Sequence, residues 1–311
     1  MTESLRTMLA GIIDYAGLFP PANLPMRTAI ENFANFRKHE HRWMLSRFIC
    51  PAARLEELSQ VGGNLFAENP AFHFSVLVGG GETVAAFQDH LAKQADAVRQ
   101  FLHRHHGNVV VDVFEIRLPS SVLAGELPDL FSQLERAESS QNACQCFYEV
   151  PSMENWSQTM RMVIPAFAKE NYGFKLRTGG VEPIAFPSCQ KVAEVVTACR
   201  DADVCWKATA GLHHPFRHKN DSVKTKMHGF LNLLFAVVLA EVHSLDETQI
   251  ETIIADENPE SFCFTQDEIC WQDFSANIDD IQRIRKTRFA GFGSCSFDEP
   301  REDLKKLNLF A

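Results

Sequence analysis

Short apolar runs alternate with amphipathic stretches through the middle of the chain. Runs rich in β-branched and aromatic residues predict six strands, and apolar residues spaced three or four apart between them predict helices. The expected strands are residues 43–50, 72–78, 109–118, 144–150, 172–177 and 204–208. The expected helices are residues 51–60, 83–104, 153–169 and 188–200, with a helical region reaching residue 138. Strand and helix repeating about every 30 residues is typical of a parallel sheet with crossover helices.

The two ends of the chain add further elements. Helical spacing predicts helices at 4–13 and 26–38, separated by a break that contains Gly17 and the pair Pro20-Pro21. After an irregular stretch at 213–228, the pattern predicts helices at 227–242, 246–255 and 275–286 and strands at 268–271 and 289–294. Eight strands in this order predict an α/β fold, a (β/α)8 TIM barrel.

One barrel accounts for the whole length of 311 residues. We therefore expect a single domain over residues 1–311, with an N-terminal helical extension at 1–40 and a helical insertion after strand 6 at 213–265. An open doubly wound sheet is the alternative, but the run Gly79-Gly80-Gly81 lacks the spacing of a dinucleotide-binding fingerprint.

Composition and charge exclude several classes of partner. The net charge of −10 argues against a general nucleic-acid surface, although a local cationic cleft in such a protein can still bind a small anion. The longest apolar run, residues 230–240, contains Asn232 and is too short to span a bilayer. The first residues show no signal-peptide pattern, and the nine cysteines form no CxxC pair, so we expect reduced thiols and a cytoplasmic location. No cofactor is implied, and a homo-oligomer is compatible with the sequence.

Charged residues stand near the carboxyl ends of the predicted strands, where the chemistry of a barrel is located. They are Asp112, Glu115 and Arg117 on the third strand, Glu149 on the fourth, Lys175 and Arg177 on the fifth, and Lys207 on the sixth. Lys175 and Arg177 share a face because side chains alternate along a strand. Lys207 belongs to the next strand, about 5 Å away.

Two lysines on neighbouring strands suggest Schiff-base chemistry. A neighbouring cation disfavours the charged form of an amine, so Lys207 is expected to lower the pKa of Lys175 and favour its attack on a carbonyl. The alternative is structural: both lysines would pair with Asp112, Glu115 or Glu149, which is the commoner role of lysines at buried strand ends.

The motifs in this region resemble those of the deoxyribose-phosphate aldolase family of class I aldolases. The quoted motifs are Lys175-Leu176-Arg177-Thr178-Gly179, Lys207-Ala208-Thr209-Ala210-Gly211, Val111-Asp112-Val113-Phe114, Ile13-Asp14, Arg47-Phe48-Ile49-Cys50-Pro51 and Gly293-Ser294-Cys295-Ser296. The resemblance covers most of the chain by the order of these motifs. Arg177 stands where the family has a small residue, and its guanidinium could clamp an anion.

The resemblance implies a carbon–carbon lyase acting on a small carbonyl substrate that is anionic or phosphorylated. Lys175 would form the Schiff base and Lys207 would perturb it. Asp112, with Glu149 or Asp14, would move protons. The expected binders of substrate or anion are Arg177, Thr178, Gly211, His213, Gly293, Ser294 and Ser296.

Two other functions remain open. His213, His214, His218 and His228 form a histidine cluster in which His213 and His214 are alternative metal ligands, although no metal is required. With Glu149 and Asp112 they would suit a metal-dependent or acid/base hydrolase or isomerase. Cys295 is also a candidate thiol nucleophile beside these histidines. The third possibility is a non-catalytic barrel that binds a small anion.

Overall fold

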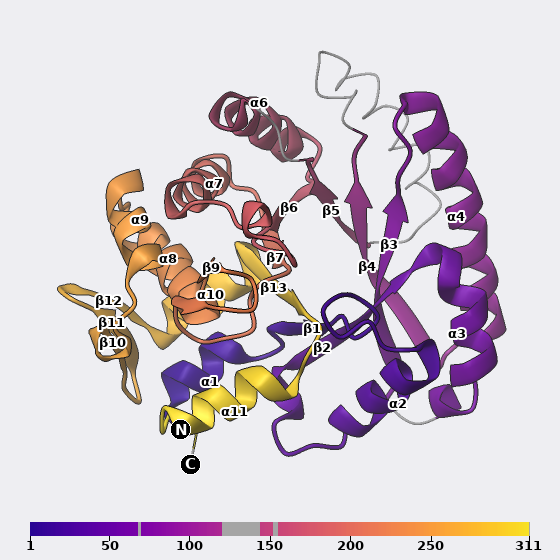
Figure 1. Ribbon diagram of the computed structural model, residues 1–311, viewed down its shortest axis with the longest axis horizontal. Coiled ribbons are helices and arrows are strands. Elements are labelled where there is room, and N and C mark those ends of the chain that lie inside the picture. Colours follow the sequence, from indigo (N-terminus) through magenta and orange to yellow (C-terminus); the bar gives the residue numbers. More distant parts are fainter. Residues whose placement is uncertain (68–69, 120–143, 152–154, 311) are drawn as a thin grey trace.

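A computed structural model describes residues 1–67, 70–119, 144–151 and 155–310. Its centre is a closed barrel of eight parallel strands, in the spatial order β1-β13-β7-β6-β5-β4-β3-β2. The barrel strands are β1 (Ile13–Tyr15), β2 (Leu45–Pro51), β3 (Phe72–Gly79), β4 (Val109–Arg117), β5 (Gln145–Glu149), β6 (Gly173–Arg177), β7 (Trp206–Thr209) and β13 (Phe289–Ser294). The structure thus confirms the predicted (β/α)8 barrel, with helices arranged around the strands (Figure 1).

One predicted barrel strand is wrong. Residues 268–271 form β11 (Glu268–Trp271), which pairs antiparallel with β10 (Phe262–Phe264) and β12 (Phe274–Asn277) in a separate sheet beside the barrel (Figure 1). The eighth barrel strand is β1, within the segment expected to be only a helical extension. β1 pairs with β13 on one side and with β2 on the other. Its three residues are all buried, and three residues are too few to display a strand period.

The helices largely follow the amphipathic pattern and begin at residues that cap them. Thr83, Ser188 and Asn277 each accept a hydrogen bond from a backbone N–H in the first turn of a helix, and Asp246 forms a capping box with Gln249. The predicted helical region up to residue 138 lies outside the described residues. The helices are α1 (Glu3–Leu9), α2 (Met26–Phe36), α3 (Leu55–Gly62), α4 (Val84–Arg104), α6 (Trp156–Lys169), α7 (Cys189–Asp201), α8 (Phe230–His243), α9 (Glu247–Ala255), α10 (Ile278–Thr287) and α11 (Asp298–Lys306).

The segment between β7 and β13 contains helices that surround the barrel and, in addition, short strands outside it. A small antiparallel hairpin, β8 (His218–Asn220) and β9 (Thr225–Met227), comes first. α8 follows, and every residue from 230 to 240 is buried, because α8 packs against α7, α9 and α10 while Phe230 stacks on Phe292 of the barrel. Because the helix is buried on all sides, residues 230–240 are apolar except for Asn232 and show no amphipathic spacing. Among the described helices, none combines the length and apolar character needed to cross a bilayer.

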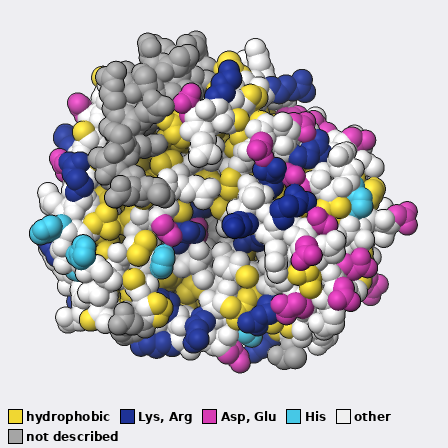
Figure 2. Space-filling model, turned by 180° about the vertical axis from the view of Figure 1, so that it is seen from behind, with side chains coloured by type: hydrophobic (Ala, Val, Ile, Leu, Met, Phe, Trp, Pro, Cys, Tyr) yellow, Lys and Arg dark blue, Asp and Glu magenta, His cyan; other side chains and the backbone are white. Residues whose placement is uncertain are grey.

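Charges of both signs are distributed over the surface. Figure 2 shows one face on which Lys and Arg side chains gather toward the middle, while acidic side chains are concentrated at its right-hand edge. The excess of acidic residues is therefore not spread evenly over the surface, and some regions of the surface are locally cationic.

Candidate active site

Glu115 joins the two lysines inside the barrel. Its Oε2 atom lies 2.7 Å from Lys175 Nζ, and its Oε1 atom lies 2.7 Å from Lys207 Nζ. Lys175 and Lys207 are direct neighbours in the register of β6 and β7, as their positions in the sequence predicted. The Ser75 hydroxyl donates a further hydrogen bond of 2.7 Å to Glu115 Oε1. All four side chains are buried.

A second carboxylate completes the environment of each lysine. Lys175 Nζ lies 2.8 Å from Glu149 Oε2, and Lys207 Nζ lies 2.5 Å from Asp14 Oδ2. Arg177 Nε donates to the other oxygen of Glu149 at 3.1 Å. A continuous chain of alternating charge therefore crosses the barrel, and its members, in order, are Asp14, Lys207, Glu115, Lys175, Glu149 and Arg177. This set of six residues is called the lysine–carboxylate network below.

The network sets the ionisation of the lysines. Burial lowers the pKa of Lys175, but the Glu115 and Glu149 carboxylates outweigh burial and raise that pKa above its ordinary value. Burial likewise lowers the pKa of Lys207, and Asp14 and Glu115 reverse this and raise it. The expectation that Lys207 lowers the pKa of Lys175 does not hold in this structure, because Glu115 lies between the two ammonium groups.

Burial raises the pKa of the two carboxyl groups next to Lys175, but their cationic partners prevail. The lysines hold the pKa of Glu115 far below its usual range. Lys175 and Arg177 hold the pKa of Glu149 below its usual value. At neutral pH both lysines are therefore protonated, and the two carboxyl groups beside Lys175 are ionised.

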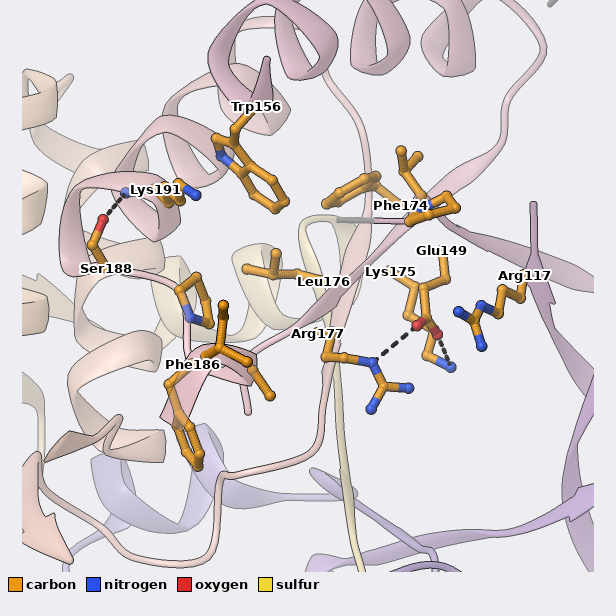
Figure 3. A pocket seen from close by; sticks show the side chains of 15 residues that line it. Arg117, Glu149, Trp156, Phe174, Lys175, Leu176, Arg177, Phe186, Ser188 and Lys191 are labelled. Carbon is orange, nitrogen blue, oxygen red and sulfur yellow. Dashed lines mark hydrogen bonds and ion pairs between the residues drawn. The ribbon is translucent and has the colours of Figure 1, made fainter. Parts of the chain in front are cut away.

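Lys175 and Arg177 both line each of two cavities in the described part of the chain. The first, of about 300 Å³, occupies the barrel mouth and is also lined by Glu115, His213 and Cys295. The second, of about 290 Å³, lies beside Glu149 (Figure 3). Lys207 lines neither of these cavities. Of the two lysines, Lys175 is thus the one that lines these cavities.

Several predicted binding residues instead shape the turns around the mouth. The buried Thr178 hydroxyl donates to the carbonyl oxygens of Ala210 at 2.6 Å and Thr209 at 3.2 Å. Gly211 has a φ of +74°, and a Cβ on it would lie 2.9 Å from the Gly179 Cα, so the two turns after β6 and β7 pack closely only with glycine there.

The Gly-Ser-Cys-Ser turn after β13 is also largely self-bonded. The Ser294 hydroxyl donates to the Ser296 carbonyl at 2.7 Å, and Ser296 Oγ accepts from Glu299 N at 3.1 Å at the start of α11. Gly293 and Cys295 line the mouth cavity, whereas Ser294 and Ser296 do not.

His213 lies at the mouth, whereas His214 faces another acid. His213 Nδ1 lies 3.0 Å from Glu299 Oε2 and 4.0 Å from Cys295 Sγ. Burial lowers the pKa of His213, but Cys295 and Glu299 outweigh it and raise the pKa to about 9, so the ring is cationic at neutral pH. His214 Nδ1 is bonded to Asp303 at 2.5 Å.

Asp112 does not join the lysines. It lies in the first half of β4, where its carboxylate pairs with Arg47 Nε at 2.7 Å and His73 Nδ1 at 3.1 Å. The β3–β4 register shifts at this point, since Phe74 faces Val111 and Ser75 faces Val113. Arg47 in turn donates its backbone N–H to Asp14 Oδ1 at 3.1 Å. Asp112 therefore holds Arg47, and of the three carboxyl groups considered as partners of the lysines, Glu115 and Glu149 bond to them.

The proposed metal ligands do not converge. His213 and His214 are bonded to different carboxylates, and their ring centroids are 6.4 Å apart. Among the described residues, one group of three donors lies close enough to hold an ion, namely His39, Glu40 and His41. The Arg301 guanidinium lies within 3.0 Å of both ring nitrogens of His39, which opposes the binding of a cation there.

The sequence named Glu115 and Glu149, with Asp112, as possible partners of the lysines, and the structure pairs Glu115 with both amines and Glu149 with Lys175. Ser75 is the residue of the site whose role the sequence did not reveal. Ser75 lies in an apolar strand and carries no distinguishing signal beyond being polar there.

The fold and the site define a (β/α)8 barrel with a buried lysine–carboxylate network beside its mouth. No protein-family model matches the sequence, and no curated protein matches it. Among solved structures, the chain is similar to one described as QR15, an aldolase, with a TM-score of 0.53 and 9% identity over 97% of each chain.

The chain also matches the catalytic domain of a mannanase from Streptomyces sp. SirexAA-E, with a TM-score of 0.41 and 15% identity over 76% of this chain and 73% of the other. The likeness to the aldolase extends over nearly the whole chain and confirms, at the level of fold, the resemblance noted from the sequence. At 9% identity it shows a shared fold alone.

Proposed function

We propose that this protein is a carbon–carbon lyase of the class I aldolase type, which forms a Schiff base between Lys175 and a small anionic carbonyl substrate. One observation carries the proposal: Lys175 is a buried lysine that lines both cavities and lies between two carboxylates. An amine in this setting has a path for substrate and two groups within 2.8 Å that can accept its proton.

The chemistry begins with a proton transfer. Lys175 rests as an ammonium group, so Glu115 or Glu149 takes its proton as the substrate carbonyl arrives, and the amine then attacks the carbonyl carbon. Loss of water gives an imine, whose protonated form withdraws electrons from the bond to be broken. A carboxylate removes the proton of the hydroxyl on the β carbon as the bond between the α and β carbons breaks, so that one fragment leaves as a carbonyl compound and the other stays on Lys175 as an enamine. Protonation of the enamine and hydrolysis of the imine restore Lys175.

Lys207 has a positioning role in this scheme. It lies outside the two cavities and holds Glu115 through one oxygen, while Asp14 binds it from the other side. The charge of Lys207 keeps Glu115 ionised at rest. Glu115 is therefore ready to accept the proton of Lys175 when the substrate arrives. Arg177 exposes about half of its side chain and lines both cavities, so it is suited to the anionic group of the substrate.

Reductive trapping tests this function. The protein is incubated with acetaldehyde, pyruvate or dihydroxyacetone phosphate and then with borohydride, and the adducts are mapped by peptide mass spectrometry. We expect an adduct on Lys175 with at least one carbonyl compound and none in the Lys175→Arg variant, which keeps the charge but cannot form the imine. Lys286→Ala, on the exposed face of α10, is the matched control and should leave trapping unchanged.

The distribution of adducts decides between the alternatives. Adducts confined to Lys207 would reverse the roles of the two lysines, and adducts on neither lysine would contradict the mechanism. Adduct formation without cleavage or condensation of any substrate would favour the non-catalytic, anion-binding barrel.

A further inference from the structure

The second cavity lies between the strand ends and the surrounding helices. It occupies about 290 Å³ between the ends of β5 and β6, the short helix η5 (Pro183–Ala185) and the beginnings of α6 and α7 (Figure 3). Lys175 and Arg177 line both this cavity and the barrel mouth, so the two cavities adjoin at these residues. Its volume is at the lower end of small-molecule sites, which run from about 300 to 1,000 Å³.

One end of the cavity is cationic. Three of its cationic side chains, those of Arg117, Lys175 and Arg177, lie at this end around the single acidic one, Glu149. Figure 3 shows Arg117 and Arg177 on opposite sides of the Glu149 carboxylate. Arg177 donates a hydrogen bond to Glu149 through Nε only. Arg117, which also lines the cavity, has no ion pair within the described part of the chain. The terminal nitrogens of two guanidinium groups are therefore available to an oxyanion.

The other end of the cavity is lined mainly by apolar side chains, with Lys191 beside them. Trp156, Leu176 and Phe186 lie there, away from Arg117 (Figure 3). The Lys191 ammonium lies 5.5 Å from the centre of the Trp156 ring and fixes the position of that ring through a cation–π contact. Such a wall suits an aromatic or branched apolar group, which would gain both burial and ring contact.

We propose that this cavity binds the acid group and the side chain of the substrate. An oxyanion would bind the terminal nitrogens of Arg117 and Arg177 beside the Glu149 carboxylate, and an aromatic or branched apolar group would pack on Trp156. The inference rests on the proposed function for its link to Lys175, and it defines the substrate class as small oxo acids with an aromatic or branched side chain, or their phosphate counterparts. Short substrates such as pyruvate would leave the apolar end unfilled.

Binding of a compound without a carbonyl next to its acid group tests the cavity independently of catalysis. The dissociation constant of 3-phenylpropionate is measured by titration calorimetry for the wild-type protein, Arg117→Gln, Trp156→Leu and the surface control Arg99→Gln. We expect at least a tenfold weaker binding in the first two variants and no change in the control. A parallel titration with 2-phenylethyl phosphate shows whether carboxylate or phosphate is preferred. Equal binding in all four proteins, or no binding of either compound, would overturn the proposal.

Trapping then separates the two proposals. Phenylpyruvate should give a Lys175 adduct at lower concentration than pyruvate, and Trp156→Leu should remove this advantage. If 3-phenylpropionate binds as expected but no carbonyl compound is trapped, the proposed function fails and the subsite stands. If pyruvate is trapped but the aromatic compounds neither bind nor react, the subsite fails and the proposed function stands.

Discussion

Glu115 is the residue on which the electrostatics of the site depend. Its two oxygens bind two different ammonium groups at 2.7 Å each, so the lysines can lie on adjacent strands without an uncompensated positive charge. The same arrangement explains why both lysines have a raised pKa although they are neighbours. A nucleophilic Lys175 must therefore be generated by a local proton transfer and not by repulsion from Lys207.

Removal of the Glu115 charge should destabilise the protein strongly. In Glu115→Gln the shape is kept, but the two buried ammonium groups then share only Asp14 and Glu149, and we expect a loss of about 3–5 kcal/mol in the free energy of unfolding. Urea denaturation at neutral pH measures this loss. Glu57→Gln, which breaks the exposed pair with Arg54, is the control and should cost less than about 1 kcal/mol. A similar small loss for both variants would show that the network does not stabilise the fold.

The lysines were predictable, whereas the choice among their carboxylate partners was not. A lysine inside a strand of apolar residues is visible in the sequence, and the order of strands placed Lys175 beside Lys207. Asp112 and Glu115 both stand in the same predicted strand, and the β3–β4 register shifts close to Asp112. That shift depends on pairing between strands, which no local pattern records.

At the scale of elements, long periodic segments were predictable and short ones were not. α4 and α7 were expected from their spacing, and six barrel strands were recognised in the middle of the chain. β1 was missed because it has only three residues, and β11 was misplaced because an apolar alternation does not tell which sheet a strand joins. The formation of β1 depends on its pairing with β13, a strand that lies far from it in the sequence.

The β1–β13 pairing leaves no room for a side chain at Gly291. Gly291 has a φ of +147°, and a Cβ on it would lie 2.6 Å from the Ile12 carbonyl oxygen. That oxygen accepts the hydrogen bond of Phe292 N at 2.9 Å, so the strands would have to separate. Gly291→Ala is expected to cost about 2–4 kcal/mol of unfolding free energy, from backbone strain together with loss of pairing.

A matched control lies close to β1 in the chain. Gly11 has a φ of +57°, and a Cβ added to it would have nothing within 4 Å, so Gly11→Ala should cost only the left-handed backbone penalty of about 1 kcal/mol. Both variants are compared by urea denaturation. If the two substitutions cost the same, steric closure between β1 and β13 is not a determinant of stability.

Across the whole molecule, the last helix is fastened to the loop that follows β7. The consecutive residues His213 and His214 are bonded to Glu299 and Asp303 of α11. α11 follows the strand that closes the barrel, so these contacts join the end of the chain to the rim of the mouth. The histidine side chains that were candidate metal ligands thus contribute to closure of the fold, and His213 also lines the cavity.

This contact should make stability depend on pH. The pKa of His213 is raised to about 9, because Cys295 and Glu299 outweigh the effect of burial, whereas the unfolded chain has the ordinary value near 6.5. The folded protein therefore holds a proton that the unfolded chain loses above about pH 6.5. The stabilisation is complete below that pH and disappears as the pH rises through about 9.

Urea denaturation of the wild type and His213→Gln at pH 6 and pH 10 measures this dependence. We expect the wild type to have a larger free energy of unfolding than His213→Gln at pH 6, and this difference to shrink by about 1–2 kcal/mol at pH 10. The value is smaller than the full pKa difference implies, because half of the Glu299 side chain is exposed. His103→Gln, an exposed histidine on α4, is the control and should follow the wild type. If His213→Gln also retains the full pH dependence of the wild type, the bond between His213 and Glu299 does not fasten α11 to the mouth.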